Sequence, residues 1–188
     1  KMAADELSEK YPSRTIRVVD SLSAALGEGL LVYHACELKE QGKSLAEVAD
    51  WLEENKLKCC HWFTVDDLYH LFKGGRVKAS GYLLAMALSV KPMMHMDNSG
   101  HLVPVGKVIG RKKSILTLAE QIATSIVNPE EQVIFISHGD CVEEAEFLAK
   151  KIKEKVRVKD VVINMLEPVI GAHSGPGTMA VFCLGEHR

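Results

Sequence analysis

Residues 132–165, QVIFISHGDCVEEAEFLAKKIKEKVRVKDVVINM, decide the fold that we predict for this chain. The apolar run at 132–137 predicts a strand, the pattern at 141–154 predicts a helix, and residues 158–165 predict a second strand. A strand, a helix and a strand at this spacing are typical of α/β layers with right-handed crossovers. The sequence therefore predicts an α/β protein.

Further elements are expected on both sides of this stretch. Two apolar segments around the turn DNSG (97–100) predict a β-hairpin at 92–108. Serine and glutamate in SLAE, residues 44–47, form a capping-box pattern that predicts the start of a helix. Other helices are expected at 2–11, 24–40, 64–74, 80–89 and 111–127, and other strands at 15–19, 58–63 and 178–184.

The chain is expected to form two lobes of α/β/α layers. Residues 1–57 are interpreted as the C-terminal remainder of a first α/β domain, and residues 58–188 as a second α/β domain with the added hairpin. Residues 15–19 have the apolar, β-branched character of a buried strand, but no earlier strand is expected with which they could pair. We therefore expect the first lobe to be incomplete, with further sequence upstream.

Composition excludes several classes of protein. The 188 residues carry a net charge of −2, whereas a nucleic-acid-binding domain needs a basic face. No apolar run is long enough to span a membrane, and no signal peptide is visible. Five scattered cysteines predict reduced thiols and not a disulfide framework. We expect a soluble, cytoplasmic protein.

The segment GAHSGPG, residues 171–177, is the first candidate site. Glycines let the backbone approach a ligand closely, while His173 and Ser174 offer groups suited to a carboxylate or phosphate. We interpret it as a loop between two strand-like apolar runs. The alternative is that Gly-Pro-Gly makes only a tight turn into the last strand.

Two further segments contain residues of types found in binding sites. Arg76 in FKGGRV follows paired glycines, and a guanidinium can grip both oxygens of an oxyanion. A solvated arginine after a helix C-cap is the alternative. The segment Cys59-Cys60-His61 lacks a second pair of ligands, so no metal site is expected.

Five segments taken together resemble the DegV family of bacterial fatty-acid-binding proteins. They are VVDSLSAALGEGLLV, FTVDDLYHLFKGGRV, the KPMM strand, the hairpin leading to GKVIGRKKS, and GAHSGPGTMAVF. The resemblance implies a two-domain α/β protein that is not itself an enzyme. It holds a long-chain fatty acid in a tunnel between its lobes and uses no other cofactor. Its implied partner is a separate ATP-binding fatty acid kinase subunit, which phosphorylates the carboxylate.

The resemblance also implies roles for particular residues. Arg76 and His173, with Ser174 beside it, would bind the lipid carboxylate. The tunnel would be lined by Phe63, Leu83, Leu84, Met86, Met93 and Ile170. Ile109 stands where many relatives have an arginine, which bears on docking of the kinase.

Two other functions stay open at this point. The chain also resembles the substrate-binding half of dihydroxyacetone kinases, in which a histidine forms an adduct with the ketone; His173 would be that residue. A regulatory module that binds no lipid is the third hypothesis. No GxxxxGK[ST] phosphate loop is present, so ATP use by this chain alone is not expected.

Overall fold

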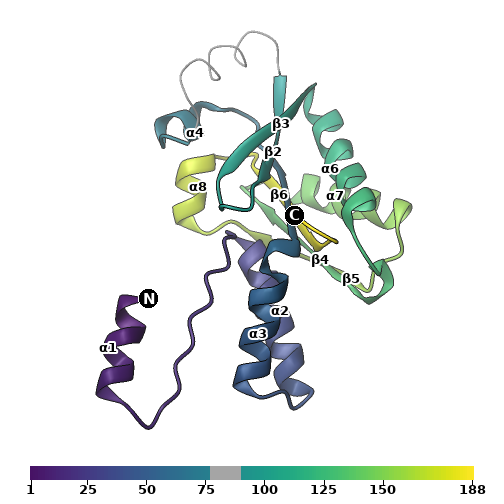
Figure 1. The fold of residues 1–188 in the computed structure, drawn as a ribbon. Coiled ribbons are helices and arrows are strands. Elements are labelled where there is room, and N and C mark those ends of the chain that lie inside the picture. Colours follow the sequence, from purple (N-terminus) through teal and green to yellow (C-terminus); the bar gives the residue numbers. More distant parts are fainter. Residues whose placement is uncertain (77–89) are drawn as a thin grey trace.

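The computed structural model of the protein describes residues 1–76 and 90–188. Within these residues a mixed sheet has the strand order β3-β2-β1-β6-β4-β5 (Figure 1). The strands are β1 (Cys59–Thr64), β2 (Val90–Met96), β3 (Leu102–Ile109), β4 (Val133–His138), β5 (Asp160–Met165) and β6 (Met179–Leu184). The predicted α/β class is therefore confirmed.

The stretch that predicted the fold forms the parallel part of the sheet. β4 and β5 run parallel and are connected by α7 (Val142–Lys155), as expected for a strand–helix–strand unit. The other neighbouring strands, including the central β1 and β6, pair antiparallel. The fold is thus α/β in its layers but mixed in its sheet.

Helices cover both faces of the sheet. α6 (Arg111–Ser125) and α7 pack on one face over the fully buried side chains of Ile134 and Ile136. On the other face α2 (Leu26–Glu40) contacts β1, β4 and β6, and α3 (Leu45–Asn55) packs against α2. Figure 1 shows α6 and α7 on the side of the sheet away from α2 and α3. Each apolar face of the sheet is buried by a helical layer.

The hairpin is formed as predicted by β2 and β3. Their register begins at the pair Val90–Ile109 and ends at Met96–Leu102, with a shift between Met93 and Met94. The backbone N–H of Gly100 donates to the carbonyl of Asp97, which closes the turn.

The capping box at the start of α3 is also formed. The N–H of Glu47 donates to Ser44 Oγ at 3.3 Å, and the N–H of Ser44 donates to Glu47 Oε2 at 2.8 Å. This backbone bond from Ser44, with Lys43 beside it, lowers the pKa of the Glu47 carboxyl to about 2.

Two predicted elements are wrong. Residues 15–19 form no strand: they are extended, and Val18 is 53% exposed. Their β-branched side chains favour a strand, but no described strand lies beside them. The apolar run before GAHSGPG is also not strand-like, because it belongs to a helix, α8 (Pro168–Ser174), which ends at Gly175. Pro168 at the first helical turn is suited to such a start.

The remaining helices are either short or not packed into the core. α1 (Met2–Lys10) buries none of its residues, and α4 (Tyr69–Lys73) spans a single turn. The helix expected at 80–89 falls outside the described residues. None of the helices in the described part of the chain is long and apolar enough to cross a bilayer.

Candidate functional site

The site lies where α4 and α8 meet at one end of the central strands. α4 follows β1 in the chain, and α8 leads into β6, which pairs with β1. The two helices contact each other. Segments about one hundred residues apart in the sequence, FKGGR and GAHSGPG, are therefore brought together.

The loop after α8 is fixed on two sides. Gly177 has φ +74°, and an added Cβ there would lie 2.6 Å from Cβ of Asp66. Gly175 has φ +80° and sits against the ring of His70. Both positions therefore require glycine for conformation and for space. On the other side, the N–H of Gly177 donates to the carbonyl of Gly139 at 2.7 Å.

A cavity of about 230 Å³ opens beside this loop. It is bounded by α4, α8, the start of β3 and the face of β1 and β6 that carries Phe63. Five residues predicted from the sequence line it: Phe63, Arg76, Ile170, His173 and Ser174. The others are Ala24, Ala25, His61, Leu71, Leu102, Leu166, Val169, Thr178 and Ala180. The lining is mainly apolar.

Cationic and hydrogen-bonding groups come from the adjoining ends of α4 and α8. Arg76 is exposed and donates from Nη1 to the carbonyl of Gly74, just after α4. His173 lies against Gly74, and Ser174 is buried and donates from Oγ to the carbonyl of Ile170 at 2.9 Å. A carboxylate placed here would meet a guanidinium and an imidazole, and the Ser174 hydroxyl would donate to it after turning from the Ile170 carbonyl.

Met93 does not line this cavity. It is buried on the opposite face of the sheet, in the cluster beneath α6 and α7, whereas Met94 lies in the cluster with Phe63. Neighbouring strand residues face opposite sides, so Met94 shares the face of Phe63, but neither methionine lines the cavity. The predicted tunnel residues Leu83, Leu84 and Met86 fall outside the described residues.

Sequence reasoning missed His61. It lies on the same face of β1 as Phe63, two residues away, and is only 4% exposed. Burial, with smaller effects from Arg188 and His95, lowers the pKa of His61 to about 3. Strand alternation from Phe63 carries this signal, because residues 61 and 63 of one strand lie on the same face. In the described part of the chain no cluster of metal-ligating side chains occurs.

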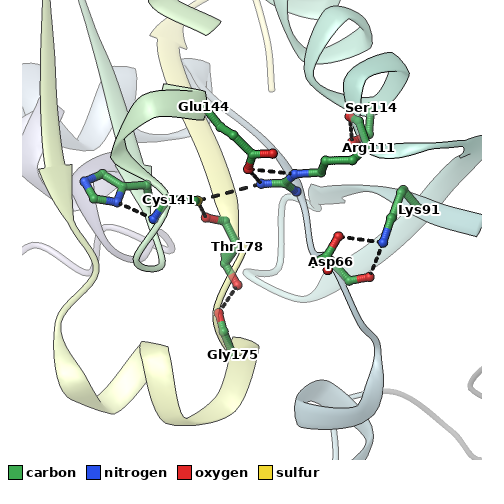
Figure 2. Close-up of polar contacts among 9 residues, drawn as sticks. Asp66, Lys91, Arg111, Ser114, Cys141, Glu144, Gly175 and Thr178 are labelled. Atoms are coloured by element: carbon green, nitrogen blue, oxygen red, sulfur yellow. Dashed lines mark hydrogen bonds and ion pairs between the residues drawn. The ribbon is translucent and has the colours of Figure 1, made fainter. Parts of the chain in front are cut away.

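Figure 2 shows the polar contacts that support the site from the other side of the loop. Arg111 donates from Nε and Nη2 to Glu144 Oε2 at 2.9 and 2.6 Å, joining the starts of α6 and α7. Nη2 also contacts Cys141 Sγ, which in turn donates to the carbonyl of Thr178 at 3.5 Å. Thr178 Oγ1 donates to the carbonyl of Gly175 at 2.7 Å.

A second, larger hollow of about 610 Å³ lies between the extended N-terminal segment and the helices α2 and α3. Its lining includes Val19, Leu31, Val32, Val48 and Leu52, and it contains none of the residues predicted for the site. Five of the nine residues predicted for the site therefore line the smaller cavity.

The protein is thus an α/β protein with a mixed sheet and a mainly apolar cavity. Polar side chains line this cavity at one end, where α4 meets α8. The chain belongs to the DegV family: the family model described as "Uncharacterised protein, DegV family" matches residues 1–186. A DegV domain-containing protein of Clostridium perfringens is 50% identical over 187 residues, which are 100% of this chain and 64% of that protein. A second one, from Streptococcus pyogenes, is 37% identical over 99% of this chain and 64% of its own. The chain thus spans about 64% of these relatives' length.

Solved structures agree with this assignment. A DegV family protein of Ruminococcus gnavus with vaccenic acid has a TM-score of 0.86 at 26% identity, covering 96% of this chain and 64% of that one. A fatty acid binding DegV family protein of Streptococcus agalactiae has a TM-score of 0.80 at 26% identity, covering 99% and 65%. The Fatty Acid Kinase (Fak) B3 protein of Streptococcus pneumoniae, loaded with linoleic acid, has a TM-score of 0.85 at 21% identity, covering 98% and 65%. This last similarity concerns the fold alone.

Proposed function

We propose that this chain is the part of a DegV protein that holds the carboxyl end of a long-chain fatty acid. The carboxylate would lie at Arg76, His173 and Ser174, and the acyl chain would run over Phe63 and Ile170. The observation that carries the proposal is the cavity itself, which places these five residues, from three separate segments, around one hollow.

The chemistry of the lining supports a lipid. An acyl chain gains roughly 0.8 kcal/mol for each CH₂ that leaves water, so apolar surface supplies most of the affinity. A positive charge within a few ångströms favours the ionised carboxylate, and Arg76 supplies it at the polar end. A ligand that fits this lining has a long apolar chain and one anionic end, as a fatty acid does.

The size of the cavity limits how much of the ligand it holds. At about 230 Å³ it is smaller than the roughly 300–1,000 Å³ of common ligand pockets. We therefore propose that the described residues enclose the carboxyl end and the first part of the acyl chain. The tunnel residues Leu83, Leu84 and Met86 are proposed to line its continuation.

We extend the proposal to a partner and to the division of the chain. A carboxylate held beside the exposed Arg76 is accessible, which supports its presentation to a separate fatty acid kinase subunit. We also propose the division of the chain into residues 1–57 and 58–188: the described sheet and the helices α6, α7 and α8 fall within 58–188, while α2 and α3, from 1–57, pack against one face of that sheet.

Mass spectrometry of the purified chain tests the proposal. The native spectrum and an organic extract are expected to contain a fatty acid at about one per chain. If the chain is isolated empty, it is incubated with oleic acid, separated from free lipid and extracted again. A chain that retains no fatty acid in either experiment contradicts the proposal, and favours a regulatory module without lipid.

A further inference from the structure

His61 is a buried polar side chain in an apolar part of the cavity. It is 4% exposed, and its ring centroid lies 4.5 Å from that of Phe182 and 5.8 Å from that of Phe63. It is nevertheless one of the side chains that line the cavity. The imidazole therefore faces a hollow bounded mainly by carbon atoms.

The hydrogen-bonding capacity of His61 is not used within the described residues. Its Nδ1 is buried without a hydrogen-bond partner. By contrast, the hydroxyls of Ser174 and Thr178, which line the same cavity, each donate to a backbone carbonyl. Buried polar groups in folded proteins are nearly always paired. Nδ1 itself has almost no accessible surface, so a partner supplied from the cavity reaches it only when the ring turns toward the hollow that His61 lines.

His61 is also remote from the polar end of the cavity. In the register of β1 with β6, Thr64 pairs with Met179 next to the glycine loop, and His61 pairs with Phe182. Three strand residues correspond to roughly 10 Å at about 3.3 Å per residue. A carboxylate held at the level of the glycine loop would therefore lie about three strand residues from His61 along β1.

A water molecule is a poor substitute for a ligand group at this place. A buried water normally makes about three hydrogen bonds. The rings of Phe63 and Phe182 beside the imidazole carry no polar atoms, and the buried hydroxyl of Ser23 near Phe182 would give a water one further partner. A polar atom attached to the ligand itself needs no such set of partners.

We propose that His61 hydrogen-bonds an oxygen carried in the middle of the acyl chain, so that this cavity selects hydroxylated fatty acids over unsubstituted ones. The proposal rests on the function proposed above and names the class of lipid. Burial keeps the imidazole neutral, since it lowers the pKa of His61 to about 3. Each nitrogen of a neutral imidazole is either a donor or an acceptor, and a hydroxyl group can pair with either kind because it both donates and accepts.

Competition between oleic acid and ricinoleic acid tests the inference. The two lipids differ by one hydroxyl in the middle of the chain. The parent protein, incubated with an equimolar mixture and freed of unbound lipid, is expected to retain ricinoleic acid in about tenfold excess. His61→Leu and His61→Phe are expected to lose that preference, and His61→Gln, which can still donate and accept, is expected to keep part of it. His101→Ala, in the exposed hairpin turn, is the control and should behave as the parent.

Each other outcome has a definite meaning. Equal retention of the two lipids by the parent overturns the role of His61 and leaves the proposed fatty-acid function standing. A preference that persists in His61→Leu and His61→Phe also overturns it. If the parent retains neither lipid, the proposed function fails and this inference fails with it. Far-ultraviolet circular dichroism of each variant establishes that it is folded, and two apolar replacements of different shape guard against one that does not fold.

Discussion

His173 lies directly against the backbone of Gly74. A Cβ added at Gly74 would be 2.6 Å from Nδ1 of the His173 ring, closer than side chains approach one another in proteins. The residue after α4 thus sets where the last turn of α8 can place its imidazole. This contact joins FKGGR and GAHSGPG, the two segments that the sequence predicts to bind the lipid carboxylate.

Substitution Gly74→Ala is expected to displace the imidazole and weaken fatty-acid retention. Gly74 has φ −76°, a value open to any residue, so the effect is steric and does not come from backbone strain. Loss of one charge-assisted hydrogen bond to the carboxylate predicts a roughly tenfold lower affinity. The measurement is titration with a fluorescent fatty acid.

Gly171→Ala is the matched control, because Gly171 lies in α8 with open space where its Cβ would be. It should bind as well as the parent. Equal affinity of Gly74→Ala and Gly171→Ala would show that the position of His173 does not matter for binding.

The polar end of the cavity is tested by Arg76→Ala and His173→Ala. Each is expected to lower fatty-acid affinity about tenfold, because each removes a donor to an ionised carboxylate. The free energy of unfolding should change little, since Arg76 is exposed and His173 only half-buried. Affinity is measured by lipid titration and stability by urea unfolding.

Exposed residues of the same types provide the controls for these two variants. The side chain of Arg157 is 85% exposed and that of His101 is 77% exposed, and neither lines the cavity. Arg157→Ala and His101→Ala should retain parental affinity. If all four variants bind alike, the carboxylate lies elsewhere.

The ion pair between Arg111 and Glu144 is expected to stabilise the contact between α6 and α7. Arg111 donates through both Nε and Nη2, and its side chain is only 16% exposed. Arg111→Lys keeps the charge but loses this two-point geometry. We expect the free energy of unfolding to fall by about 1 kcal/mol, measured by urea unfolding.

Arg157→Lys is the comparison for that prediction. Arg157 is 3.9 Å from Glu130, in a pair whose two side chains are 85% and 68% exposed. Exposed pairs of this kind contribute little, so a change within about 0.5 kcal/mol is expected. Equal losses in both variants would mean that burial of the Arg111 pair adds nothing.

Local sequence patterns predict an element correctly where the residues that specify it are neighbours in the sequence. Ser44 and Glu47 specify their own capping box, and the turn at 97–100 specifies the hairpin. Residues 15–19 have equally strong strand character but form no strand, because a strand also needs a partner. α8 was missed because seven residues are too few to display a helical period.

The sequence predicts the polar residues at one end of the cavity better than it predicts the apolar residues that line the rest. Arg76 and His173 are marked by the glycines beside them, and the structure places Gly74, two residues before Arg76, against His173. The lining depends on strand parity, which puts Met93 on the face of the sheet away from the cavity and Met94 on the face of Phe63. The same parity places His61 next to Phe63, a relation that composition alone does not reveal.

The buried His61 is expected to make the protein less stable as the pH falls. Its pKa is lowered to about 3 in the folded chain, whereas an unfolded histidine titrates near 6.5. Between these values the unfolded chain binds a proton that the folded chain does not. The stability contributed by neutral His61 is therefore fully present above pH 6.5 and is lost progressively as the pH falls toward 3, with a limiting slope of about 1.4 kcal/mol per pH unit.

Urea unfolding at a series of pH values between 7 and 4 measures this loss. His34 and His95 also have pKa values lowered by burial, so the parent curve contains their contributions as well. Neither His61→Leu nor His61→Gln titrates at position 61, so both variants should lose stability less steeply than the parent below pH 6.5. Parallel curves for the parent and the two variants would mean that His61 becomes protonated in the folded chain, and a neutral imidazole in the cavity would then be excluded.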